Sequence, residues 1–160
     1  MPVAWMLMSS ATTEIITFFV KWVRDTSPSV QPAVIMTDRD QAQIAALEIT
    51  FPQSRILLCT WHVLRAIRSH FVTSQFQGLW EKVKAWVKTD DIGQFYNIWD
   101  EISSDPLVPE SVVKYLKTKW LPVLHRWSMI GRKHRSIFEE GNTNMLIEAY
   151  VVYILSEIQN

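Results

Sequence analysis

The segment between residues 34 and 63 places the strongest constraint on the fold. Two short apolar runs, residues 33–37 and 55–59, predict buried strands, and residues 41–50 between them predict a helix. The first run is followed by Asp38, and the second ends at Cys59 with His62 three positions later. Open α/β sheets build their binding sites where strands end, so this unit predicts an α/β fold with a site at these strand ends.

The segment before this unit predicts one more strand and one helix. Residues 3–8 are apolar and predict a short buried strand. A helix follows, with Thr12 or one of the two serines before it as the N-cap. It ends before Ser27 and Pro28, because the residue that precedes a proline is pushed out of the helical region.

The second half of the chain predicts helices and no clear strand between residues 75 and 127. Apolar residues at helical spacing define the predicted segments, with a proline-marked loop near residue 106, a kink or restart at Pro122, and a polar loop at 131–142. The predicted helices span residues 76–87, 92–102, 112–120 and 144–158. Asp90 or Asp91 caps the second of these, and the tryptophans at 80, 86, 99, 120 and 127 are expected to form the core of the helical part.

Composition limits the classes of protein that fit. The 160 residues are 48% apolar and 20% charged, which is typical of a globular chain and not of a disordered one. Sixteen basic residues balance sixteen acidic ones, so any nucleic-acid binding must depend on local patches. One cysteine excludes an internal disulfide framework. No apolar run reaches the roughly 18 residues of a membrane span, so no membrane interaction is expected.

Two acidic residues near the first strand compete for a chemical role. Asp40 has a structural explanation, because with Gln43 it resembles a capping box for the helix at 41–50. Asp38 has no such explanation and would project from the end of the strand. Its alternative role is that of a second acid that stabilises the turn. Glu148 lies among apolar residues of the last predicted helix, where a buried carboxylate needs a partner or a metal. Its alternative is an exposed position on the helix surface.

Several motifs in order resemble the Mutator-like element (MULE) transposase domain. These are VIMTDRD at 34–40, the helix leading to Phe51 and Pro52, RILLCTWHV at 55–63, a tryptophan-rich helical segment, and TNMLIEAY at 143–150. The resemblance implies an RNase H-like core of the DD(E/D) transposases with a helical insertion. The implied domains are a partial core at 1–72, an all-helical insertion at 73–140 and a C-terminal helix at 141–160 that returns to the sheet.

The resemblance also implies the chemistry. Asp38 would be the second catalytic acid and Glu148 the third, and both would bind Mg²⁺ or Mn²⁺ for DNA strand cleavage and transfer. The family's first acid and two central strands have no counterpart in this sequence, so we expect a truncated copy that is inactive alone. The alternative is a domesticated, non-catalytic DNA-binding or protein-interaction domain. Binding to transposon ends and a nuclear location are implied by the resemblance only.

Two further groups of residues have both a functional and a structural interpretation. Cys59 and His62 have the spacing of a zinc-ligand pair, but they also fit a buried cysteine and a helical histidine, and a structural zinc needs about four ligands. Five basic residues could contact DNA phosphates or could form solvated surfaces. They are Arg65, Arg68, Arg132, Lys133 and Arg135.

Overall fold

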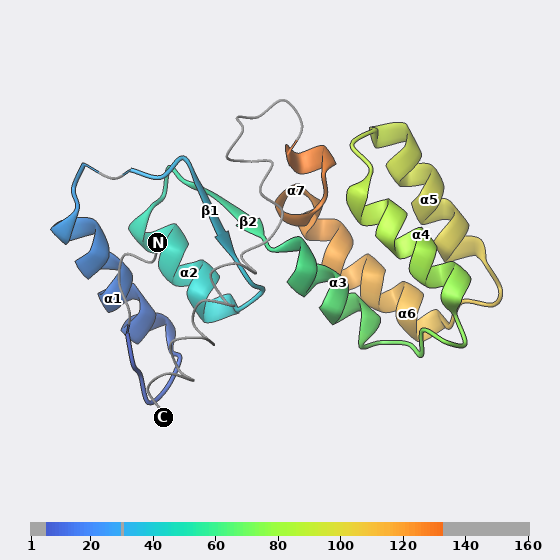
Figure 1. Ribbon diagram of the computed structural model, residues 1–160, viewed down its shortest axis with the longest axis horizontal. Helices are drawn as coiled ribbons and strands as arrows, with labels where there is room; N and C mark the ends of the chain where they lie inside the picture. Colours follow the sequence, from blue (N-terminus) through green and yellow to red (C-terminus); the bar gives the residue numbers. More distant parts are fainter. Residues whose placement is uncertain (1–5, 30, 133–160) are drawn as a thin grey trace, which may run out of the picture. The chain divides into compact units, whose positions relative to one another are not determined.

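The computed structural model describes residues 6–29 and 31–132 of the chain (Figure 1). The chain divides into two compact units, whose described parts are residues 6–59, without residue 30, and residues 60–132. We call them the N-terminal unit and the helical unit. The predicted helix at 144–158, its return to the sheet and Glu148 lie outside the described residues.

The N-terminal unit combines two helices with two parallel strands. Its elements in chain order are α1 (Thr13–Thr26), β1 (Val34–Thr37), α2 (Gln41–Thr50) and β2 (Arg55–Leu58). β1 pairs in parallel with β2, in a register that places Val34 opposite Arg55 and Thr37 opposite Leu58. The helix α2 makes the crossover that two neighbouring parallel strands require. This confirms a mixed α/β arrangement here, whereas an RNase H-like core is not confirmed by two strands.

Side-chain caps fix where both helices of this unit begin. The Thr12 hydroxyl accepts a hydrogen bond from the Ile15 amide of α1 at 3.4 Å. The Asp40 carboxylate accepts one from the Gln43 amide of α2 at 2.7 Å. Because free amides at a helix N-terminus need such acceptors, these residues set the helix starts that the sequence predicted. The two predicted helices and the strand positions at 33–37 and 55–59 are confirmed.

The predicted strand at residues 3–8 is wrong for its described part. Residues 6–8 are not in a strand, and Leu7 is 99% exposed. A strand must pair its backbone groups with a neighbour, and in the described part of the chain β1 pairs only with β2. The apolar character of this segment has a different cause, since Met6 and Met8 line a cavity beside α1.

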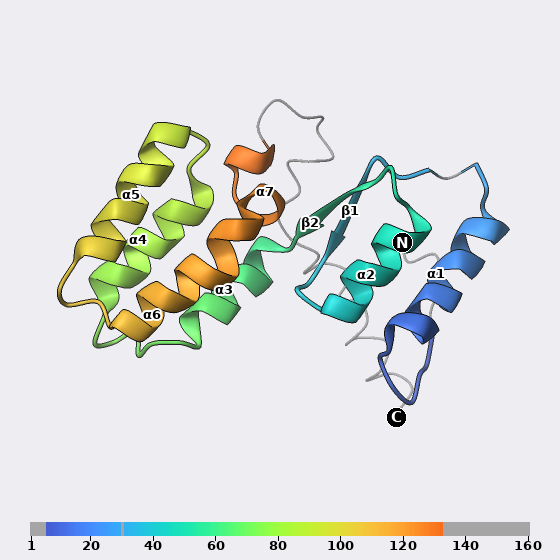
Figure 2. The same cartoon turned by 180° about the vertical axis from the view of Figure 1, so that it is seen from behind.

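The helical unit consists of consecutive helices (Figure 2). They are α3 (Thr60–Arg68), α4 (Gln77–Lys88), α5 (Ile92–Ser104), α6 (Glu110–Tyr115), the π-helix η1 (Leu116–Trp120), the short 3-10 helices η2 (Leu121–Val123) and η3 (Ile130–Arg132), and α7 (Leu124–Trp127). No strand occurs between residues 75 and 127, as predicted. Asp91 is the N-cap of α5, with its carboxylate 2.7 Å from the Gln94 amide.

Aromatic rings form the core of the helical unit. Trp86, Trp120, Trp127 and Phe95 are fully buried. The Trp86 ring lies 4.8 Å from Trp127 and 5.1 Å from Phe95, between ring centroids. Such offset and edge-to-face pairs add stability beyond the burial of their area. The prediction that the tryptophans form this core is confirmed for these three, while Trp80 and Trp99 are only partly buried.

Pro122 changes the helix geometry around it, as the sequence predicted. The backbone before it widens into the π-helix η1, where the Leu121 amide donates to the Leu116 carbonyl. Proline has no amide hydrogen and its ring collides with the carbonyl four residues earlier, so a regular α-helix cannot continue through it. The chain then passes through the 3-10 turn η2 before α7 begins at Leu124.

The end of the described chain requires a glycine. A Cβ atom added at Gly131 would lie 2.5 Å from the His125 carbonyl oxygen, which is closer than real Cβ contacts allow. The predicted polar loop at 131–142 is wrong for its first two residues, because Gly131 and Arg132 belong to η3, and the rest of it lies outside the described residues. The boundary between the two units follows Cys59, upstream of the predicted domain boundary at 72/73, and the domain division stays a prediction.

Candidate functional site

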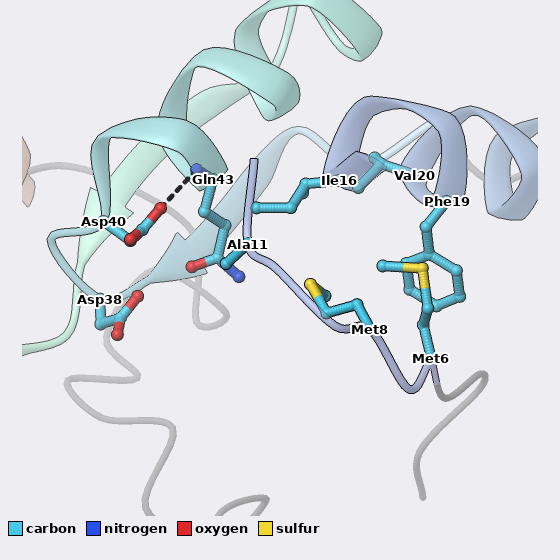
Figure 3. A pocket seen from close by; sticks show the side chains of 9 residues that line it. All are labelled: Met6, Met8, Ala11, Ile16, Phe19, Val20, Asp38, Asp40 and Gln43. Carbon is cyan, nitrogen blue, oxygen red and sulfur yellow. Dashed lines mark hydrogen bonds between the residues drawn. The ribbon is translucent and has the colours of Figure 1, made fainter. Parts of the chain in front are cut away.

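Asp38 lies on the wall of a cavity in the N-terminal unit (Figure 3). The residue follows β1 directly, and the cavity encloses about 340 Å³. Asp38, Asp40 and Gln43 line its polar side. Its apolar side is formed by α1 and the segment before it, through Met6, Met8, Ala11, Ile16, Phe19 and Val20. The cavity therefore has two carboxylates on one side and an apolar wall on the other.

The two aspartates at this cavity differ in what their carboxylates do. Asp40 is held by its hydrogen bond to the Gln43 amide, the dashed line of Figure 3. Asp38 has a weaker contact, with the hydroxyl of the buried Thr37 3.5 Å from its Oδ1 atom. Asp38 is partly exposed, and because Asp40 is the N-cap of α2, Asp38 is not needed for that role and can contact a ligand in the cavity. The N-cap role of Asp40 is confirmed, and the chemical role of Asp38 stays a prediction.

Gln43 has a role that the capping-box pattern did not predict. The Thr37 hydroxyl donates a hydrogen bond to the Gln43 side-chain oxygen. Gln43 therefore joins the end of β1 to the first turn of α2 through its side chain, while its backbone amide joins Asp40. A polar residue three positions after an N-cap signals helix capping in a sequence, but the identity of its side-chain partner depends on the tertiary structure.

The donor set at the cavity suits a hard cation only in part. Carboxylate oxygens are the preferred protein ligands of Mg²⁺ and Mn²⁺. Within residues 6–29 and 31–132, however, no three His, Cys, Asp or Glu side chains come together to hold a metal ion. Glu148, the other predicted ligand, lies outside that range. The described residues thus supply two carboxylates at this cavity, those of Asp38 and Asp40, and the metal site stays a prediction.

Cys59 and His62 occupy different environments. Cys59 is fully buried, and its amide donates to the Thr37 carbonyl at 2.8 Å, which extends the strand pairing by one residue. His62 lies in the first turn of α3 and is partly exposed, with its ring 4.8 Å from the Trp61 ring in an edge-to-face contact. A burial of this kind explains the cysteine without a metal, and the zinc assignment stays a prediction.

The predicted DNA-contacting residues differ in exposure. Arg65 and Arg68 are exposed on α3, and each guanidinium lies near a tryptophan ring, at 5.1 Å from Trp61 and 5.9 Å from Trp80. Arg132 is only 4% exposed, so it contributes to the interior of the helical unit. Lys133 and Arg135 lie outside the described residues. Among the described members of this set, the two α3 arginines are therefore the exposed ones.

Two tryptophans beside these arginines were not predicted as site residues. Trp61 is 38% exposed, although tryptophan is mostly buried in folded proteins. Its spacing from Arg65 and Arg68 places all three on one face of a helix, which the sequence alone could have shown. Trp80 comes from α4, so its position next to Arg68 could be found only from the packing of α3 against α4.

Comparison with known proteins gives one similarity. Residues 1–66 match the family model of the MULE transposase domain. The match includes Asp38, Cys59 and His62, and it leaves most of the helical unit outside. No curated protein and no solved structure matches the chain. No helix in the part of the chain described here is long and apolar enough to cross a membrane. The match covers less than half of the 160 residues and supports a transposase-related origin for the N-terminal part.

Proposed function

We propose that this chain is part of a MULE-type DNA transposase catalytic domain, with Asp38 as a metal-binding acid. The observation that supports this most directly is the position of Asp38. It stands at the end of β1 with a partly exposed carboxylate at a cavity, within the residues that match the transposase domain. Strand ends of α/β sheets are where such enzymes place their catalytic groups.

The proposed reaction is metal-assisted cleavage and transfer of a DNA strand. A divalent ion bound by carboxylates would supply Lewis acidity and charge stabilisation at the phosphodiester. In this chain Asp38 and Glu148 would hold the ion. Asp40 would keep α2 in place through its hydrogen bond to the Gln43 amide, so that the strand end holds the Asp38 carboxylate toward the cavity.

Asp38 and Glu148 alone are few metal ligands for an enzyme that cleaves DNA. Two-metal sites for phosphoryl transfer hold two ions about 4 Å apart with several carboxylate ligands. With Asp38 and Glu148 alone, we expect weak binding of Mn²⁺ and no detectable DNA cleavage by the isolated chain. Cleavage of DNA would then need at least one further acid besides these two.

A second candidate function is a non-catalytic DNA-binding domain that derives from a transposase. Residues 49–80 contain no Asp or Glu, and they include the exposed arginines Arg65 and Arg68. A polyanion such as DNA would be attracted to these two exposed arginines. This candidate keeps the DNA partner and dispenses with the metal.

Binding of Mn²⁺ to the full chain separates the two candidates. Isothermal titration with Mn²⁺ should show binding that falls in Asp38→Asn and in Glu148→Gln. Asp40→Asn is the matched control, because it lies at the same cavity and asparagine caps a helix as well as aspartate does. Equal Mn²⁺ binding by the wild type and Asp38→Asn would contradict the catalytic assignment and leave the DNA-binding candidate.

A cleavage assay on supercoiled plasmid tests the expected inactivity. We expect no nicking by the isolated chain in Mg²⁺ or Mn²⁺. Nicking that requires the metal and disappears in Asp38→Asn, but not in Asp40→Asn, would show that the ligand set is more complete than proposed here.

A further inference from the structure

The exposed side of α3 and α4 bears alternating aromatic and cationic side chains. Trp61, Arg65 and Arg68 follow one another along α3 at spacings of four and three residues, which places them on one helix face. Trp80 and Lys84 lie four residues apart on α4. We call these five residues the α3–α4 strip.

Contacts between these side chains join them into two groups, one on α3 and one that bridges α3 and α4. The Arg65 guanidinium lies 5.1 Å from the Trp61 ring centroid. Arg68 reaches across from α3 to the Trp80 ring at 5.9 Å, and the Lys84 ammonium lies 5.9 Å from the same ring. A cation within about 6 Å of an aromatic face is attracted to it, so the cations are partly positioned before any ligand binds.

The charge of the strip is poorly balanced by nearby acids. Lys84 pairs with Glu81 at 2.7 Å, but among the described residues no carboxylate pairs with Arg65 or Arg68. Residues 60–132 contain ten Lys and Arg against seven Asp and Glu, whereas residues 6–59 contain four against five. The helical unit therefore attracts anions, and this attraction is strongest where its acids are absent.

We propose that the α3–α4 strip binds single-stranded nucleic acid. Such a strand presents phosphates to the arginines and free base faces to the tryptophans, and surfaces that bind it combine these two features. A duplex keeps its base faces stacked inside, so it would use the cations and leave Trp61 without a role. An acidic peptide would likewise have no planar group for Trp61. The choice of DNA as the bound strand rests on the proposed function. The proposal does not depend on metal binding by Asp38.

Fluorescence anisotropy with the full chain tests this proposal. The probe is a labelled oligothymidine of about 16 nucleotides, long enough for the site sizes seen in such proteins. Trp61→Ala should weaken its binding about ten-fold, while Trp61→Phe, which keeps an aromatic face, should retain most of it. Arg65→Ala with Arg68→Ala should reduce the slope of log affinity against log salt by about 1.4, because each phosphate contact on a single strand contributes about 0.7.

Matched variants control for general effects of exposure and charge. Trp22→Ala removes another exposed tryptophan, and Lys114→Ala with Lys117→Ala removes the same charge from a different surface. Both should leave oligothymidine binding unchanged. An abasic oligonucleotide of equal length should bind more weakly than oligothymidine, and its affinity should not respond to Trp61→Ala.

Three results would overturn the proposal. Equal or tighter binding of a duplex or of the abasic strand would show that bases do not stack on the strip. Tighter binding of polyglutamate than of oligothymidine would assign the surface to an acidic peptide. If the variants of the strip lose no more affinity for oligothymidine than the control variants do, the strip is not the binding surface. Each result is separate from the Mn²⁺ titration, so the metal assignment of Asp38 can stand or fail independently.

Discussion

The two units of this protein bury different kinds of side chain. The core of the N-terminal unit is aliphatic, with Ile44, Leu47, Leu57 and Leu58 among its buried residues, and it leaves two aromatic residues of α1 exposed, Phe18 at 75% and Trp22 at 52%. The helical unit instead buries aromatic rings at its centre, those of Trp86, Phe95, Trp120 and Trp127, and leaves Trp61 exposed. The two units are also built differently. The N-terminal unit pairs two strands that one helix connects, whereas the helical unit packs consecutive helices.

This contrast separates two kinds of chemistry along one chain. The strand end in the N-terminal unit holds a carboxylate at a cavity, which is suited to a cation. The helical unit has more basic than acidic residues, and its exposed arginines contact tryptophans, which is suited to an anion with planar groups. The balanced charge of the whole sequence hides this division.

The largest expected effect is the loss of a ring from the aromatic core. Trp127 contacts Trp86 and Phe95, and its Nε1 atom donates to the Trp120 carbonyl at 2.9 Å. Trp127→Ala should lower the free energy of unfolding in urea by about 3–5 kcal/mol, because it leaves a cavity and removes this hydrogen bond. The exposed Trp22→Ala should change it by no more than about 0.5 kcal/mol. Similar losses in both would refute the contrast between the two units.

Two glycines of the helical unit should respond with opposite signs. Gly131→Ala places a Cβ against the His125 carbonyl, and overpacking of this kind costs about 1–3 kcal/mol. Gly78 lies in α4 with nothing within 4 Å of an added Cβ, so Gly78→Ala should stabilise the helix by about 0.5–1 kcal/mol. Thermal unfolding followed by circular dichroism gives both values. A stable Gly131→Ala would show that α7 and η3 can move apart.

The two aspartate caps offer an internal comparison between the units. Asp40 and Asp91 each accept a backbone amide at 2.7 Å, so replacing either with alanine should cost about 1 kcal/mol, and replacing either with asparagine should cost little. Where the units unfold separately, Asp40→Ala should lower the melting temperature of one transition and Asp91→Ala that of the other. Shifts of a single shared transition by both variants would show that the units unfold together.

The smallest expected effect is a pH dependence at the start of α1. Hydrogen bonds from its own backbone amide and from the Thr12 hydroxyl hold the pKa of the Glu14 carboxyl below its ordinary value of 4.5. Because the folded-state pKa is lowered, the stabilisation is complete above 4.5 and is lost as the pH falls through the folded-state pKa. The melting temperature of the wild type should therefore be slightly higher than that of Glu14→Gln near neutral pH, and the two should be equal at about pH 2. A difference that persists in acid would contradict this origin.

The candidate site was predictable from the sequence only in its local part. Asp38 at a strand end and Asp40 as a cap follow from the order of apolar and polar residues, and both are confirmed as positions in the fold. The apolar wall opposite Asp38 was not predictable, because Met6 and Met8 are distant in sequence and resemble a strand. The same holds for Trp80, which meets Arg68 only because α3 packs against α4.

The sequence by itself determined the elements whose signals are short-range. Helical spacing, the caps at Thr12, Asp40 and Asp91, and the break at Pro122 act within a few residues, so they set where helices begin and change. Tertiary structure alone decided that residues 6–8 do not form a strand, that Gln43 joins Thr37, and that Gly131 is required beside His125. Gln43 and Gly131 depend on partners that folding brings close. Residues 6–8 have no strand partner in the described part of the chain, and a strand without a partner cannot satisfy its backbone hydrogen bonds.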